Sequence, residues 1–124
     1  MPDNSTIAVD AMGGDEGLAV MLAGVAHARR RHESMRFLLV GDHDQITEGL
    51  KSHPNLSQHS EIVHADGVVS GSEKPSQAIR RAKTTSMGIA IDLVKQKRAG
   101  AAVSSGNTGA LMAMAKLSLR TLPG

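Results

Sequence analysis

Two glycine-rich turns carry the groups best suited to chemistry. The first spans residues 9–17 and places adjacent Gly13 and Gly14 between Asp10 and Asp15. The second spans residues 104–113 and consists largely of serine, glycine, asparagine and threonine before an apolar segment. Glycines let a ligand approach main-chain N–H groups closely, and small hydroxyl and amide side chains add further donors. In the second turn, such groups suit an inorganic phosphate or a developing oxyanion.

Both turns fall between an expected strand and an expected helix. A strand over 6–12 and a helix over 17–32 frame the first turn, whereas a strand over 100–105 and a helix from Thr108 to Leu119 frame the second. The unpaired N–H groups and the dipole of a helix N-terminus attract anions. By spacing alone, the first turn indicates only a tight turn, and the second is equally compatible with helix capping and with anion binding. Neither matches the P-loop, and the first lacks the dinucleotide-binding spacing.

The rest of the chain repeats the alternation of short apolar strands and helices. We expect strands at 37–40 and 61–65, a helix from its N-cap Asp42 to Lys51 that is broken at Pro54, a loop at 66–74, and a helical region at 75–98 interrupted near 84–86. This alternation predicts an α/β fold with a mostly parallel sheet and helices on both faces, a Rossmann-like three-layer sandwich. Because the sequence stops on a Pro-Gly dipeptide, we expect the sandwich to be incomplete in this chain.

Composition excludes several classes of function. The 124 residues contain no cysteine, which rules out a disulfide, a thiolate metal site and a cysteine nucleophile among them. Phe37 is the only aromatic residue and the net charge is +2, so the stacking surface and the field typical of nucleic-acid-binding proteins are missing. The histidines lack metal-ligand spacing, and only His64, near the end of an expected strand, is a candidate for lining a cleft. We therefore expect no metal, no cofactor and no nucleic-acid partner.

The two turns together resemble the PlsX family of acyl-[acyl-carrier-protein]:phosphate acyltransferases. Residues 7–15 read IAVDAMGGD, similar to the opening motif of that family, and residues 105–113 read SGNTGALMA, similar to its second motif. The segments 39–42, 62–65 and 74–87 also resemble the family, so the resemblance covers nearly the whole chain. It identifies residues 1–124 as the N-terminal part of a single PlsX-like α/β acyltransferase domain, with the C-terminal part absent.

The resemblance implies an acyl transfer that serves phospholipid biosynthesis. Orthophosphate would attack the thioester of acyl-[acyl-carrier-protein] directly, without a covalent enzyme intermediate, to give acyl-phosphate. Catalysis would then rest on positioning the phosphate and on stabilising the tetrahedral oxyanion. We expect the 124 residues alone to be inactive.

The same resemblance suggests which residues bind substrate. The anion cradle would be formed by Ser105, Gly106, Asn107, Thr108 and Gly109. The facing wall of the cleft would be formed by Gly13, Gly14 and Asp15. Weaker candidates for contacts with phosphate or the carrier are Lys83 and Ser86. The catalytic base is unassigned, and the weak candidates for a catalytic role are Asp10, Asp15 and Asn107.

Partners and location also follow from the resemblance. It implies orthophosphate and acyl-carrier protein as substrates, a homodimer in the full-length protein and a cytoplasmic location. Contact with the inner face of the membrane would come only from the absent C-terminal part. The apolar segment 18–28 is well short of the ~20 residues needed to span a bilayer, and we expect it to be a buried helix.

Other functions stay open at this point. A phosphate acetyl- or butyryltransferase would use a coenzyme A thioester, and activity with acyl-carrier protein against acyl-coenzyme A would discriminate it. A non-catalytic, truncated α/β binding module would keep the sheet without a working site. A nicotinamide-dependent dehydrogenase gains support from fold analogy alone, which cannot carry function.

Overall fold

A single parallel sheet organises the chain. The computed structural model describes residues 5–12 and 17–119. Within them four strands pair in the order β3-β2-β1-β4, and every neighbouring pair is parallel. The strands are β1 (Thr6–Asp10), β2 (Arg36–Gly41), β3 (Ser60–His64) and β4 (Ala101–Ser104). The expected α/β class with a parallel sheet is confirmed.

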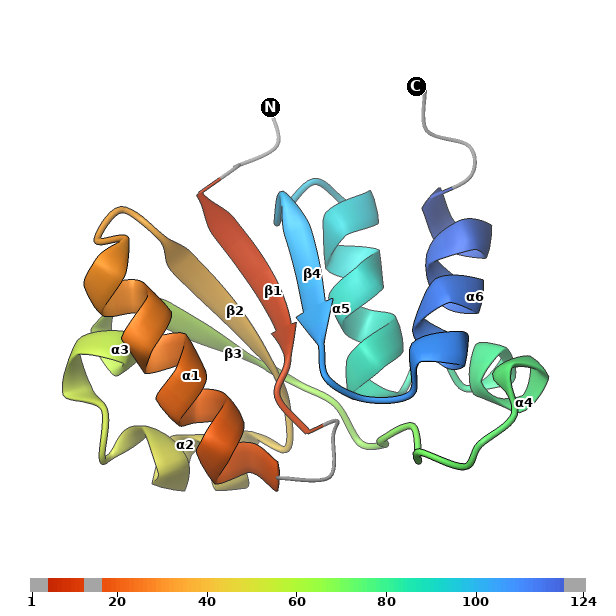
Figure 1. The fold of residues 1–124 in the computed structure, drawn as a ribbon, viewed down its shortest axis with the longest axis horizontal. Coiled ribbons are helices and arrows are strands. Elements are labelled where there is room, and N and C mark those ends of the chain that lie inside the picture. The colour runs from red at the N-terminus through yellow and green to blue at the C-terminus, as the bar shows by residue number, and fades with distance from the viewer. Residues whose placement is uncertain (1–4, 13–16, 120–124) are drawn as a thin grey trace.

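Helices lie on both faces of this sheet (Figure 1). In the described residues they are α1 (Gly17–Arg31), α2 (His43–Leu50), α3 (Pro54–Gln58), α4 (Pro75–Arg80), α5 (Ser86–Lys95) and α6 (Thr108–Leu119). Helices α1, α2 and α3 cover one face, and α5 packs on β1, β2 and β4 from the other. Helix α6 packs mainly against α4 and α5, so it extends the α5 side of the molecule.

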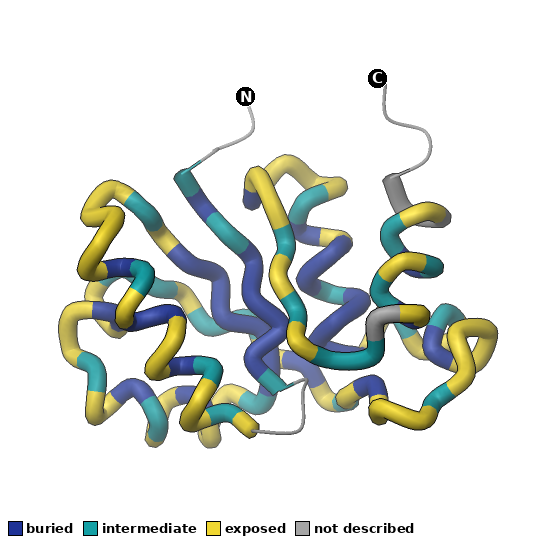
Figure 2. Tube along the Cα trace, in the orientation of Figure 1, coloured by how far each residue is buried: buried dark blue, intermediate teal, exposed yellow. Residues whose placement is uncertain are grey.

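The alternation of side chains along the strands divides the core in two. Val9 packs with Leu39 and Leu22 of α1 in one apolar cluster, whereas Ala8 packs with Leu93 of α5 in another. This is the period of two that a strand buried on both faces produces. Figure 2 shows the result as a band of buried residues through β1 and β2 and along the inner side of α5. The buried strands β1 and β2 therefore support the residues at the carboxyl edge of the sheet.

The element boundaries differ from expectation in ways that have local causes. The helical region expected over 75–98 is two helices, and the predicted interruption near 84–86 is confirmed. Thr85 is extended there, and its Oγ1 accepts a hydrogen bond from Gly88 N at 3.2 Å, so Thr85 caps α5. Pro54 breaks the preceding helix but also begins α3, because proline fits the first turn of a helix. Strand β1 ends at Asp10 rather than at residue 12.

Candidate functional site

The candidate site lies at the edge of the sheet where β1 and β4 end. Parallel strands end at the same edge, and the pairing register sets Asp10 beside Ser104. The N-terminus of α5 reaches the same place and brings Ser86 there. In open α/β sheets, ligands bind just outside the carboxyl ends of the strands. This edge is therefore the candidate substrate site.

A buried carboxyl group joins three segments at this edge. Asp10 is only 1% exposed, and its Oδ1 accepts hydrogen bonds from Ser86 Oγ at 2.6 Å and from Met12 N at 3.2 Å. Its Oδ2 accepts a hydrogen bond from Ser104 Oγ at 2.8 Å. The donors come from the start of α5, the turn after β1 and the end of β4. Asp10, Ser86 and Ser104 are called the Asp10 network below.

The turn after β4 is connected to this network at its first residue. Ser104 Oγ donates to Asp10 and also accepts a hydrogen bond from Gly106 N at 3.1 Å. Ser105 and Gly106 bend the chain between β4 and α6. The backbone of the turn is thus tied through one hydroxyl group to the end of β1.

Asn107 holds the other end of the same turn. Its Nδ2 donates to the carbonyl oxygens of Ser70 at 3.1 Å and Glu73 at 2.7 Å, and its Oδ1 accepts from Ala110 N at 3.1 Å. Both amide hydrogens are therefore used within the chain, and the amide oxygen caps α6. The structure gives the Asn107 side chain the role of a clamp on the loop 66–74.

The loop 66–74 is itself tied to the turn between α4 and α5. Arg81 Nη1 donates to Glu73 Oε1 at 2.6 Å, and Arg81 Nη2 donates to Val68 O at 3.3 Å. Lys83 lies exposed on that turn, and within the described residues no hydrogen bond or ion pair joins it to the Asp10 network. Among the described residues, no hydrogen bond or ion pair joins Lys83 to the turn after β4 either.

The first turn of α6 presents backbone donors at the candidate site. Because α6 begins at Thr108, the N–H groups of Thr108 and Gly109 have no partner within the helix, while that of Ala110 is capped by Asn107. Gly109 is exposed and carries no side chain that could block access. Such a helix end is suited to binding a phosphate.

The other described residues predicted to bind substrate lie either in the turn after β4 or inside the edge of the sheet. Ser86 is fully buried with its hydroxyl group on Asp10, so it lies inside the edge rather than on its surface. Ser105 and Gly106 lie in the turn after β4. The backbone of Thr108 opens α6, and its side chain is not among those described. The expected facing wall, Gly13, Gly14 and Asp15, falls outside the described residues.

Ser104 is the residue that sequence reasoning missed. It stands next to the second motif, but its importance depends on β4 lying beside β1, so that Asp10 and Ser104 become register partners. The order of strands cannot be read from one sequence. The available signal was a small hydroxyl residue at the end of an expected strand.

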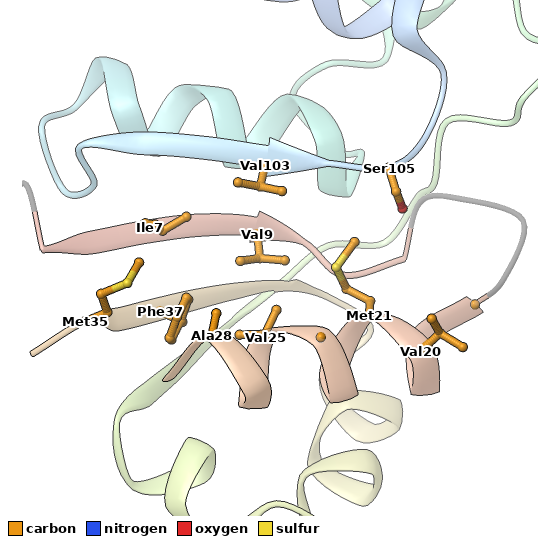
Figure 3. A pocket seen from close by; sticks show the side chains of 12 residues that line it. Ile7, Val9, Val20, Met21, Val25, Ala28, Met35, Phe37, Val103 and Ser105 are labelled. Carbon is orange, nitrogen blue, oxygen red and sulfur yellow. The ribbon is translucent and has the colours of Figure 1, made fainter. Parts of the chain in front are cut away.

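An apolar groove opens on the face of β1 and β4 that α5 does not cover (Figure 3). It has a volume of about 650 Å³ and ends at Ser105, which alone among its described lining residues carries a hydroxyl group. The other residues that line it are Ile7, Val9, Gly17, Val20, Met21, Gly24, Val25, Ala28, Met35, Phe37 and Val103. Val20 and Val103 are 52% and 46% exposed, so apolar surface continues up to the turn after β4.

His64 is not part of the Asp10 network. It ends β3, which lies at the opposite edge of the sheet from β4. Its Nδ1 accepts from His43 N at 3.1 Å, and its Nε2 lies 2.9 Å from Asp66 Oδ1. These contacts tie β3 to the start of α2 rather than bringing His64 to the turn after β4.

Residues 5–12 and 17–119 contain neither a metal-binding cluster nor a helix that could span a membrane. In this part of the chain, no group of three histidine, aspartate or glutamate side chains is arranged to hold a metal ion. None of the helices described there has both the length and the apolar composition needed to cross a bilayer.

Comparison with known proteins shows the family. The family model described as "Fatty acid synthesis protein" matches residues 5–124. A phosphate acyltransferase of Erythrobacter litoralis is 64% identical over 118 residues, which cover 95% of this chain and 33% of that protein. Phosphate acyltransferases of Bradyrhizobium diazoefficiens and Nitrobacter hamburgensis are 58% and 52% identical, covering 95% and 100% of this chain and 34% and 35% of their own length.

The match extends along the whole chain but not along the whole of its relatives. The chain spans about a third of the length of the curated relatives it matches. The match includes residues 7–15 and residues 105–113, the two motifs on which the PlsX resemblance rested. This chain therefore belongs to the fatty acid synthesis protein family, and its similar curated relatives are phosphate acyltransferases.

Proposed function

We propose that this chain is the N-terminal part of a phosphate acyltransferase that converts acyl-[acyl-carrier-protein] and orthophosphate to acyl-phosphate for phospholipid biosynthesis. The observation that carries the proposal is the turn from β4 into α6. There, α6 begins four residues after β4 ends, so the first N–H groups of the helix, those of Thr108 and Gly109, and the positive end of its dipole follow directly on the carboxyl end of β4. The names of the similar relatives support the same reaction class.

The proposed reaction needs positioning more than it needs a reactive side chain. An oxygen of orthophosphate attacks the thioester carbonyl carbon, and the carbonyl oxygen becomes an oxyanion. Collapse of the tetrahedral intermediate breaks the C–S bond, which releases acyl-phosphate and the carrier thiol, the latter after taking up a proton. Backbone N–H groups that bind phosphate and a developing oxyanion lower the barrier of such a step. The 124 residues offer no cysteine as a competing nucleophile.

The groove supports the acyl half of the proposal. It brings apolar surface from α1, β1 and β4 up to Ser105, at the beginning of the proposed anion cradle. An acyl substrate likewise combines an apolar chain with a polar reacting group, which matches an apolar groove that ends at a polar turn. The carrier protein as donor, the homodimer, the cytoplasmic location and membrane contact through further chain rest on the family resemblance alone.

A substitution at Gly109 tests the anion cradle. A Cβ at this position would lie 3.4 Å from Pro75 Cγ and 3.6 Å from Asn107 Oδ1, which is ordinary contact, and alanine is favoured over glycine within a helix. Gly109→Ala in the longer enzyme should therefore preserve the melting temperature. The added methyl group next to the two N–H groups should raise the KM for orthophosphate roughly tenfold or more, as a small misplacement of a bound group does.

The control is Gly24→Ala in α1, where a Cβ has no neighbour within 4 Å. It should leave the KM for orthophosphate unchanged. If Gly109→Ala also leaves that KM unchanged, the cradle is not at this turn. Activity measured with acyl-coenzyme A and with acyl-carrier protein identifies the donor. A preference for coenzyme A would replace the proposed substrate, and a lack of any phosphate-dependent activity would contradict the function.

A further inference from the structure

The Asp10 network is organised by a side chain that substrate does not reach. Asp10 is 1% exposed and Ser86 is fully buried. Each carboxyl oxygen of Asp10 accepts from a serine hydroxyl group, at 2.6 Å from Ser86 and 2.8 Å from Ser104. A group covered in this way acts on its surroundings through its partners rather than by touching a ligand.

The direction of the hydrogen bonds shows which segment Asp10 acts on. Ser104 Oγ carries a single proton, which it donates to Asp10 Oδ2. The lone pairs of the same oxygen are then available to Gly106 N, which donates to it at 3.1 Å. Asp10 therefore orients a hydroxyl group that in turn fixes the backbone of the turn after β4.

That turn is the one that leads into the proposed anion cradle. Ser104 fixes its first half, and Asn107 fixes its second half through Ser70 and Glu73. The N–H groups of Thr108 and Gly109 follow directly after these two anchors. A shift in either anchor moves the donors relative to the sheet edge.

We propose that Asp10 is a positioning residue for the acyl transfer, acting through Ser104 and Gly106 to set the backbone donors that bind phosphate. The inference rests on the proposed function, and it names a residue that governs the site without contacting substrate. Ser104 and Asp10 belong to one pathway of hydrogen bonds. The Ser86 bond stabilises the same carboxyl group from the side of α5.

Kinetics of Ser104→Ala in the longer enzyme test this pathway. The variant removes the hydroxyl group between Asp10 and Gly106 and should lower kcat/KM for orthophosphate roughly 10- to 100-fold, because small displacements of a binding group have effects of this size. The KM for the acyl donor should change by less than about threefold, since the groove is lined by other residues. Asp10→Asn should show the same pattern, and Ser104→Thr, which keeps the hydroxyl group, should recover most of the loss.

The matched control is Thr85→Ala. Thr85 is buried beside Ser86 and caps α5 through Gly88 N, but its side chain donates to neither Asp10 nor the turn after β4. It should lower the melting temperature about as much as Ser104→Ala while leaving kcat/KM for orthophosphate near the wild-type value. Equal kinetic losses in both variants, in proportion to their loss of stability, would reduce the network to a structural role. A wild-type enzyme without phosphate-dependent activity would instead overturn the function itself.

Discussion

Strands β1 and β4 present one closed face and one open face. On the closed face, α5 packs over Ala8 and Ala102, and the strands end in the Asp10 network. On the open face, α1 buries Val9, but its register partner Val103 is 46% exposed and lines the groove. The same two strands therefore carry buried or partly buried side chains on one side and, at Val103, accessible apolar surface on the other.

The difference separates two kinds of contribution to function. Polar groups on the closed face have their hydrogen bonds satisfied by the chain, so a change there acts through the fold and the position of neighbouring segments. Exposed apolar groups on the open face, such as Val103, contribute little to the fold of these 124 residues and are free to contact a ligand or further polypeptide. Substitutions on the two faces should therefore differ in size and in what they affect.

The largest effect on stability is expected on the closed face at Gly88. A Cβ there would overlap the carbonyl group of Ala82, because α5 begins directly against the preceding turn. The gain in helix propensity from alanine, about 1 kcal/mol, is smaller than the cost of forcing two backbone segments apart. Gly88→Ala should lower the free energy of unfolding by about 2–3 kcal/mol or abolish cooperative unfolding.

Chemical denaturation of the chain measures this effect. Gly24→Ala is the matched substitution on the open side, since its Cβ meets nothing within 4 Å, and it should raise stability by about 0.5–1 kcal/mol. Similar results for the two glycines would mean that α5 is not held as tightly as the closed face requires.

A smaller loss is expected when the cap of α5 is removed. Thr85 is fully buried, and its Oγ1 accepts from Gly88 N at 3.2 Å. Thr85→Ala leaves that N–H group without its partner and should cost about 1–2 kcal/mol. Thr85→Ser keeps the oxygen and should recover most of the difference in denaturation experiments. A serine variant as unstable as the alanine variant would assign the loss to the missing methyl group instead.

The smallest effect on the 124 residues is expected on the open face. Val103→Ala should cost less than about 1 kcal/mol, because Val103 is already half exposed. Val9→Ala is the matched substitution, with the same residue type in the adjacent strand, and it should cost about 1.5–3 kcal/mol because Val9 is buried under α1. Equal losses at the two positions would show that the groove is closed in solution.

The same pair of variants sharpens the assignment of the groove in the longer enzyme. If the groove holds the acyl chain, Val103→Ala should stay nearly neutral in stability and should raise the KM for the acyl donor. If further polypeptide covers the groove, Val103→Ala should become as destabilising as Val9→Ala and leave that KM unchanged. Melting temperature and steady-state kinetics of the two variants distinguish these outcomes.

Much of the fold could be predicted because its causes are local. Short apolar runs separated by glycine-rich turns predict parallel strands and helices. The position of Asp42 before an expected helix predicts an N-cap, and its Oδ1 accepts a hydrogen bond from Gln45 N at 2.9 Å. The interruption before α5 was visible as a threonine-rich stretch. The sequence analysis does not predict the helix that starts at Pro54, because proline both ends one helix and fits the first turn of the next.

The candidate site could be predicted only in outline. Sequence motifs located the turn from β4 into α6, but they could not show that the Asn107 side chain is used by the loop 66–74 or that Ser86 is buried against Asp10. Those contacts join residues far apart in the chain. They depend on which strands are neighbours and on how deeply α5 sits.

The family, the alternation of strands and helices and the turn from β4 into α6 could be inferred from the sequence alone, since motif wording and periodicity are properties of neighbouring residues. The meeting of the end of β1, the end of β4 and the start of α5 at one carboxyl group became visible only in the folded chain. The tertiary structure also decided which face of β4 is covered. The reason is physical: hydrogen bonds and burial act across space, and β4 reaches β1 only after the chain has passed through β2 and β3.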